Sequence, residues 1–170
     1  MRLTGGRLRG RVLTGAVSAG VRPTSARVRE ALFSMVGQDL DGWRALDAFG
    51  GSGLLGFEAY SRGAEVTISE RRSQVVRRIK QSATELGAVV TVRCADAAAI
   101  LSEGQWDLIL LDPPYAEDPC TWLERAAPAA TEVLVIEHDS RREVPMAIGG
   151  LVMDRQRRYG STTLSLYRPR

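Results

Sequence analysis

A chain of 170 residues, of which 44% are hydrophobic and 25% charged, is long enough for one globular domain with a buried core. No apolar stretch approaches the roughly 20 residues that span a bilayer, and residues 1–15 lack the continuous apolar region of a secretory signal. One histidine and two cysteines without CxxC spacing provide no Cys/His zinc site. We therefore expect a cytoplasmic, monomeric protein with no metal and no membrane segment.

The beginning of the chain is strongly basic. Residues 1–29 contain seven arginines and no acid, although the net charge of the whole chain is only +3. Residues 1–23 are rich in glycine and arginine, which predicts a loose β-hairpin or an arm that orders on binding. A solvated basic face is the alternative, but the absence of acids favours an arm that binds phosphates, with Arg9 and Arg11 among its contacts.

The first predicted helix begins after Thr24 or Ser25, either of which can cap it, and ends at Gly37. Apolar residues recur at helical spacing between these ends. The other face of the helix carries Arg27 and Arg29, so the helix can pack on a core while it presents cations.

From residue 43 onward, strands and helices alternate. Strands are predicted at residues 43–49, 65–70, 89–93, 107–111 and 132–137, and helices at 53–63, 73–87, 96–103 and 120–127. Such alternation is typical of a parallel, doubly wound α/β sheet with right-handed crossovers. Residues 151–168 predict two more strands around a turn, so we expect an antiparallel pair at the end of the sheet. The sequence thus divides into a basic extension, residues 1–37, and one α/β domain, residues 38–170.

A glycine-rich loop follows the first of these strands. Gly51, Gly53 and Gly56 match the spacing G-x-G-x-x-G, which allows a tight turn and a close approach of a ligand to the backbone at a helix N-terminus. Glu70 ends the second strand about 20 residues later, where an acid can bind ribose hydroxyls. This order favours a nucleoside cofactor over a loop that serves only helix packing.

Asp47, which precedes the glycines, indicates which nucleoside binds. A carboxylate there would repel a pyrophosphate but suits a ligand with an ammonium and a sulfonium, such as S-adenosylmethionine. Asp96 follows the third strand and can accept a hydrogen bond from an adenine amine, cap the next helix, or do both. No Walker sequence with its lysine occurs, which excludes a P-loop site. A nicotinamide dinucleotide stays as an alternative.

The segment "DPPY" ends the fourth predicted strand. Asp112 and the carbonyl of Pro113 can each accept one N–H of an exocyclic amine and ease its proton loss during methyl transfer. Pro114 locks the backbone that aims this carbonyl, and Tyr115 can stack on an unstacked base. A simple turn is one alternative, and a 5-methylcytosine mechanism with Cys120 as nucleophile is another.

Four segments together resemble the RsmD family of class I S-adenosylmethionine methyltransferases, which methylate a guanine N2 in small-subunit ribosomal RNA. They are, in order, "RPTSARVREALFSMV", "LDAFGGSGLLGFEAYSRGA", "LLDPPY" and "VIEH", and the resemblance covers essentially the whole chain. It implies a Rossmann-like α/β fold with a seven-stranded, mostly parallel sheet and helices on both faces. It also implies ribosomal RNA, or the small ribosomal subunit, as the partner.

The same resemblance implies roles for individual residues. S-adenosylmethionine would be bound by Asp47, Phe49, Gly50, Gly51, Gly53, Glu70, Asp96 and Ala97. The amine would be oriented by Asp112, Pro113, Pro114 and Tyr115, and RNA would be contacted by Arg22, Arg27 and Arg29.

Two rival functions stay open at this point. An adenine-N6 methyltransferase acting on DNA or RNA could use the same tetrapeptide, and the methylated nucleoside would separate the two activities. The chain could also be a non-catalytic RNA-binding assembly factor with a vestigial methyltransferase fold.

Overall fold

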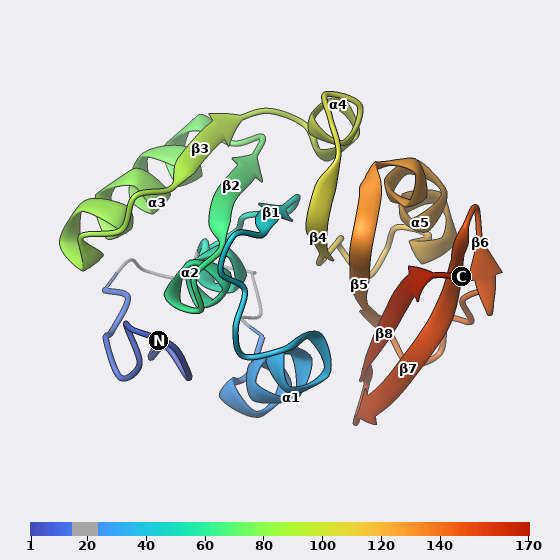
Figure 1. Cartoon of the computed structure of the whole chain (residues 1–170). Coiled ribbons are helices and arrows are strands. Elements are labelled where there is room, and N and C mark those ends of the chain that lie inside the picture. The colour runs from blue at the N-terminus through green and yellow to red at the C-terminus, as the bar shows by residue number, and fades with distance from the viewer. Residues whose placement is uncertain (15–23) are drawn as a thin grey trace.

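One mixed β-sheet forms the centre of the computed structural model, which describes residues 1–14 and 24–170 (Figure 1). The described strands lie in the order β3-β2-β1-β4-β5-β8-β7-β6. They are β1 (Arg44–Asp47), β2 (Glu65–Glu70), β3 (Thr91–Cys94), β4 (Trp106–Leu111), β5 (Ala130–Asp139), β6 (Ala147–Ile148), β7 (Leu151–Tyr159) and β8 (Thr162–Pro169). The helices are α1 (Ala26–Val36), α2 (Leu54–Ser61), α3 (Ser73–Leu86), α4 (Ala97–Leu101) and α5 (Pro119–Ala126), with a 3-10 turn at Ala127–Ala129. None of the helices in the described part of the chain is long and apolar enough to cross a membrane.

The sheet is parallel in its first five strands and antiparallel in its C-terminal part. Strand β1 pairs in parallel with β2 and β4, β2 pairs with β3, and β4 pairs with β5. Strand β8 runs antiparallel to both β5 and β7, so the predicted α/β sheet with an antiparallel C-terminal pair is confirmed. The described residues contain eight strands where seven were expected. The additional strand, β6, has only two residues, too few for the alternating pattern that predicts a strand.

Alternate residues of the central strands pack in two hydrophobic cores, one on each face of the sheet. On β4, Leu108 and Leu110 pack in the core that includes α1, α2 and α3. Ile109 and Leu111 pack in the core that includes α4 and α5. Because successive side chains of a strand point to opposite faces, the position of a residue along its strand determines which helices it faces.

Helix α1 packs on the first of these cores. Ser25 caps it, with its Oγ accepting a hydrogen bond from the N–H of Val28 at 3.3 Å. At the other end, the N–H of Gly37 donates to the carbonyl of Phe33. The apolar face of the helix, with Leu32 and Phe33, is buried. The N-terminus of α1 thereby comes to lie beside β5, where Thr24 contacts Glu137.

Residues 1–14 form a hairpin that packs against α2. The N–H of Leu3 donates to the carbonyl of Arg11 at 2.9 Å, and Arg2 pairs with Val12 in an antiparallel bridge. Leu3 is also buried in the core that contains α1, α2 and α3. The hairpin therefore shares a hydrophobic core with the α/β domain. The division of the chain into two parts at residue 37 stays a prediction.

Candidate active site

A cavity of ≈ 1020 Å³ lies at the carboxyl ends of the parallel strands. Its walls come from the loops after β1, β2, β3 and β4, the end of β5, the N-terminus of α1 and the β7–β8 turn. Strands β1 and β4 are neighbours in the sheet. Helix α2, which follows β1, packs on one face of the sheet, whereas α5, which follows β4, packs on the opposite face. A crevice therefore opens between the carboxyl ends of the two strands. The predicted residues in its lining are Arg27, Phe49, Gly51, Glu70, Asp96, Ala97, Asp112, Pro113, Pro114 and Tyr115.

Asp47, at the end of β1, is only 1% exposed and does not belong to this lining. Its Oδ2 accepts a hydrogen bond from the N–H of Gly56 at 3.0 Å, which ties the first turn of α2 to the strand. Its Oδ1 is buried without a partner among the described residues. Burial is the main reason why the pKa of Asp47 is raised to about 7. One acceptor atom is therefore left for a donor that the described protein residues do not supply.

The glycines of the loop serve different purposes. A Cβ at Gly50 would lie 2.8 Å from Ile68, and one at Gly53, where φ is +78°, would lie 2.9 Å from Phe57. Both glycines therefore allow the loop to pack tightly, and neither lines the cavity. Gly51 does line it, and a Cβ there would meet nothing closer than 3.7 Å. The packing alternative thus explains Gly50 and Gly53, whereas Gly51 exposes its backbone to a ligand.

Glu70, at the end of β2, presents a fixed anionic group to the cavity. Its Oε2 accepts from the N–H of Gly51 at 3.2 Å, and its Oε1 accepts from the backbone N–H and Nε of Arg72 at 2.9 and 3.1 Å. Burial would raise the pKa of Glu70, but the hydrogen bonds and charge of Arg72 outweigh this and lower it. An ionised acceptor with a defined orientation is what ribose hydroxyls require.

Asp96 caps α4, with its Oδ1 accepting from the N–H of Ala98 at 2.8 Å. The capping role considered for it is therefore observed. Asp96 and Ala97 also line the cavity, so the residue is placed where an adenine amine could be bound as well.

Asp47, Asp112 and Glu137 form a row of carboxyl groups on neighbouring strands. Asp47 is level with Leu110 of β4, which in turn is level with Val135 of β5. Asp112 follows Leu110 by two residues, and Glu137 follows Val135 by two. Since alternate residues of a strand share a face, both carboxyl groups lie on the face of Leu110 and Val135, which α1 covers. Burial, followed by the negative charges of Glu137 and Asp47, raises the pKa of Asp112 well above its ordinary value. No hydrogen bond to Asp112 occurs among the described residues, so its carboxyl group is available to a substrate.

Tyr115 is 38% exposed, and its hydroxyl is fixed by hydrogen bonds. Its Oη shares a hydrogen bond of 2.6 Å with Oγ1 of Thr162 in the β7–β8 turn and donates to Oε1 of Glu137 at 3.4 Å. Burial, the largest influence, raises the pKa of Tyr115, so the hydroxyl stays neutral. A fixed ring at the opening of a cavity can stack on an unstacked base.

Sequence reasoning missed several residues of the cavity wall, of which Glu137 and Trp122 have the clearest contacts with predicted site residues. Glu137 lines the cavity and accepts a hydrogen bond from Oγ1 of Thr24 at 3.0 Å. The sequence indicates no role for it beyond its place in the segment "VIEH". Trp122 of α5 packs edge to face on Phe49, with 4.8 Å between the ring centroids. The register between β4 and β5 identifies Glu137 as a neighbour of Asp112, and that register cannot be read from the sequence.

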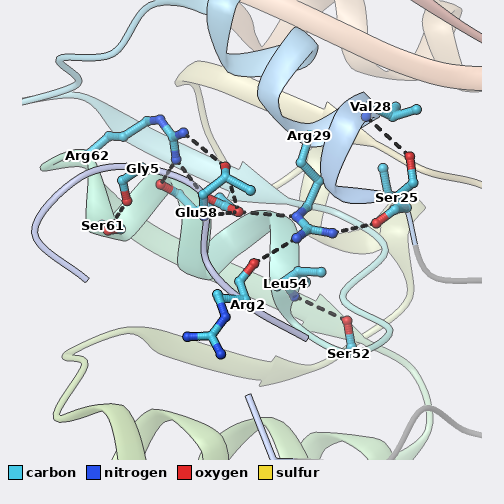
Figure 2. A network of polar contacts seen from close by, with 12 residues as sticks. Arg2, Gly5, Ser25, Val28, Arg29, Ser52, Leu54, Glu58, Ser61 and Arg62 are labelled. Carbon is cyan, nitrogen blue, oxygen red and sulfur yellow. Dashed lines mark hydrogen bonds and ion pairs between the residues drawn. The ribbon is translucent and has the colours of Figure 1, made fainter. Parts of the chain in front are cut away.

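Arg29, predicted to contact RNA, is instead buried in a network of polar contacts (Figure 2). Its guanidinium contacts Oε1 of Glu58 at 3.1 Å and donates to the carbonyls of Thr24 and Arg2 at 2.6 and 2.8 Å. Arg62 binds the other oxygen of Glu58 at 2.6 Å. Because Arg29 is 3% exposed, it cannot reach an RNA phosphate, and the sequence-based expectation is corrected.

The other arginines predicted to contact RNA lie in two places. Arg27 is exposed at the cavity, with its guanidinium 5.7 Å from the ring centroid of Tyr159. Arg9 and Arg11 are exposed on the N-terminal hairpin, where Arg11 donates to the carbonyl of Glu85 near the end of α3. A helix that connects two parallel strands ends near the amino-terminal end of the second strand. The hairpin contacts this end of α3, so it lies away from the cavity at the carboxyl ends of the strands. Arg22 is outside the described residues.

The groups needed for the alternative chemistries are poorly placed. Cys120 is not in the cavity lining, and burial raises the pKa of its thiol, which leaves little thiolate to act as a nucleophile. Among the described residues, no group of three potential ligands could hold a metal ion.

The residues present fit S-adenosylmethionine. Glu70 is an ionised acceptor for ribose hydroxyls, Gly51 exposes its backbone, and Phe49 offers an apolar surface. The Oδ1 of Asp47, which has no partner among the described residues, suits a cationic ligand better than a pyrophosphate. The volume of the cavity also reaches the upper end of the roughly 300–1000 Å³ that is usual for one ligand, so there is room for a base beside a cofactor.

Fold and site together define a class I S-adenosylmethionine-dependent methyltransferase, the enzyme class expected from the sequence. The family model described as "Conserved hypothetical protein 95" matches residues 1–168. The chain belongs to this family, the RsmD family, which confirms the resemblance found in its sequence.

Individual relatives match over nearly their whole length. The Bacillus subtilis protein YlbH is 37% identical over 183 residues, which covers 100% of both chains. The Escherichia coli K12 protein named "Ribosomal RNA small subunit methyltransferase D" is 32% identical, with 98% of this chain and 89% of the relative covered. The solved structure of the Escherichia coli protein yhhF has a TM-score of 0.86 at 28% identity, covering 99% of this chain and 97% of that one.

Proposed function

We propose that this protein transfers a methyl group from S-adenosylmethionine to the exocyclic N2 amine of a guanine in 16S ribosomal RNA. One observation carries the proposal: the cofactor loop after β1 and the segment Asp112 to Tyr115 after β4 line the same cavity. The name of the Escherichia coli relative supports ribosomal RNA of the small subunit as the substrate. We accordingly expect a monomer that works in the cytoplasm on ribosomal RNA or on the small subunit.

In this proposal, the predicted cofactor residues that line the cavity bind S-adenosylmethionine. When bound, S-adenosylmethionine supplies an electrophilic methyl group on a positively charged sulfur. Glu70 accepts hydrogen bonds from the ribose hydroxyls, and Asp96 accepts one from the adenine amine. Phe49 and Ala97 contact the adenine ring, while Gly51 lets the cofactor approach the backbone.

The DPPY segment prepares the amine for reaction. The lone pair of an exocyclic amine is delocalised into the base, which makes the nitrogen a weak nucleophile. Asp112 and the carbonyl of Pro113 each accept one N–H, which favours a tetrahedral nitrogen, and Asp112 takes the proton that leaves. Pro114 fixes the backbone, and Tyr115 stacks on the base. A pKa of Asp112 above its ordinary value suits this base role near neutral pH.

Two arginines of the cavity wall are placed to hold the RNA backbone. Arg27 comes from α1 and Arg158 from the end of β7, and both lie in the cavity lining near Tyr159. Phosphate contacts of this kind position a nucleic acid without reading its sequence.

The transfer of a labelled methyl group from S-adenosylmethionine to unmethylated small subunits, and separately to naked 16S ribosomal RNA, tests the proposal. We expect label in the RNA with wild-type protein and with Asp39→Ala, whose exposed carboxyl group lies outside the cavity. Asp112→Ala should lose turnover while it still binds S-adenosylmethionine in calorimetry. No incorporation by wild-type protein into either substrate would favour a non-catalytic RNA-binding factor.

A further inference from the structure

We propose that Glu137 selects guanine at this site by accepting the N1–H of the target base while Asp112 holds the N2 amine. The inference rests on the proposed function and adds to it the residue that distinguishes guanine from adenine. Glu137 belongs to β5 and lines the same cavity as the DPPY segment.

The strand register brings the two carboxyl groups side by side. Leu111 of β4 is level with Ile136 of β5, and the next residues are Asp112 and Glu137. Neighbouring strands are about 4.8 Å apart, and side chains at the same level point to the same face. The charge of Glu137 contributes to the raised pKa of Asp112, as expected for close neighbours. Two acceptors thus face the same part of the cavity.

Hydrogen bonds from two directions orient the carboxylate of Glu137. Thr24 donates to Oε2 at 3.0 Å from the N-terminus of α1, and Tyr115 donates to Oε1 at 3.4 Å. The carbonyl of Thr24 is in turn bound by the buried guanidinium of Arg29 at 2.6 Å. Glu137 also lines the cavity, so its carboxylate borders the space that a bound base would occupy. A base that stacks on Tyr115 would bring its edge close to Glu137.

This pair of acceptors matches the edge of one base only. Guanine presents N1–H and the N2 amine as adjacent donors, which two neighbouring carboxylates can bind together. Adenine presents its N6 amine next to N1, which is an acceptor, so a carboxylate there would face a lone pair. A site built to bind a donor rejects an analogue that lacks it, because its buried polar group is left unpaired. Glu137 therefore also disfavours the adenine-N6 activity.

A base analogue tests this role. After the methylated guanine has been mapped with wild-type protein, a 16S ribosomal RNA fragment is made with either guanine or 2-aminopurine at that position. 2-Aminopurine keeps the reactive N2 amine, but its N1 is an acceptor. We expect wild-type protein to prefer guanine, and Glu137→Gln to reduce the ratio of kcat/KM for the two RNAs by about 10-fold or more, because the amide can donate to N1. Glu132→Gln, at an exposed position of the same strand, should leave the ratio unchanged.

The outcomes separate this inference from the proposed function. If wild-type protein methylates no guanine in the RNA, the proposed function fails. If it methylates guanine and 2-aminopurine equally well, N1–H is not read and the role of Glu137 is refuted, even if the variant is inactive. If Glu137→Gln is active and its ratio of kcat/KM for the two RNAs equals that of wild type, the role of Glu137 is refuted too. A loss of stability alone would lower both rates together and leave this ratio unchanged.

Discussion

Arg29 of α1 and Glu58 of α2 form an ion pair of 3.1 Å, with side chains only 4% and 0% exposed. Arg62, which follows the last residue of α2, pairs with the other oxygen of the same carboxylate. Arg29 also binds the carbonyl of Arg2, so it joins the N-terminal hairpin to helices α1 and α2 (Figure 2). It binds the carbonyl of Thr24 as well, and the hydroxyl of Thr24 donates to Glu137. An arginine that looked like an RNA contact in the sequence therefore organises the wall of the active site.

Removal of this side chain should destabilise the protein strongly. Arg29→Met removes one of the two arginines that pair with Glu58, and it removes the donor to two carbonyls. This should cost about 3–5 kcal/mol in the free energy of unfolding. Urea denaturation measures this cost. Arg77→Met, at an exposed position of α3, should change the stability by no more than about 0.5 kcal/mol. Equal effects of the two variants would mean that the network contributes little.

Glu70 should determine cofactor affinity. Glu70→Gln removes the charge that would bind the ribose hydroxyls, and hydrogen bonds to charged groups contribute about 1.5–3 kcal/mol. We therefore expect S-adenosylmethionine to bind about 10- to 100-fold more weakly in calorimetry. Glu65→Gln, an exposed position at the start of the same strand, is the matched control. An unchanged affinity of Glu70→Gln would show that the ribose is bound elsewhere.

Asp47 should make the stability depend on pH. Its pKa is about 7 in the folded protein against an ordinary value of 3.8, so the folded state binds the proton more tightly. Its contribution to stability is therefore present below about pH 4 and is lost as the pH rises toward 7. Relative to wild type, Asp47→Asn should gain stability across this window, by at most about 1.4 kcal/mol per pH unit. Denaturation curves of both proteins at several pH values measure the difference, and parallel pH profiles would contradict it.

Asp112 should control the pH dependence of the rate. Its carboxylate form accepts the amine, and its raised pKa means that the rate falls as the pH drops through a range above that of an exposed aspartate. Because the charge of Glu137 raises this pKa, Glu137→Gln should shift the midpoint of kcat/KM to lower pH. The exposed control Glu132→Gln should not. A midpoint that stays in place in Glu137→Gln would argue against coupling of the two carboxyl groups.

Arg27 should contribute to RNA affinity without affecting cofactor binding. Arg27→Gln removes one phosphate contact, so binding should weaken and the slope of log affinity against log salt concentration should fall by roughly 1. Filter binding of 16S ribosomal RNA at several salt concentrations provides both numbers. A salt slope identical to that of wild type would exclude this phosphate contact.

The alternating strands and helices could be predicted because apolar runs and glycine stops mark each element. The two-residue strand β6 could not, because it is shorter than the pattern that identifies a strand. Glu70 and Asp112 were found because they follow apolar strands whose carboxyl ends meet at one edge of the sheet.

Long-range pairing explains what the sequence did not reveal. The position of Glu137 beside Asp112 depends on the register of β4 and β5, and the burial of Arg29 depends on Glu58, which lies 29 residues away in the chain. Composition shows that both residues are charged, but only their partners determine whether that charge faces solvent, a ligand or an internal ion pair.

The identity of the methylated nucleoside tests the central claim most directly. Small-subunit RNA treated with the protein and S-adenosylmethionine is digested to nucleosides and analysed by mass spectrometry, with Asp112→Ala as the control. The account predicts N2-methylguanosine that depends on the protein and is absent with the variant. N6-methyladenosine, or no methylated nucleoside at all, would contradict it.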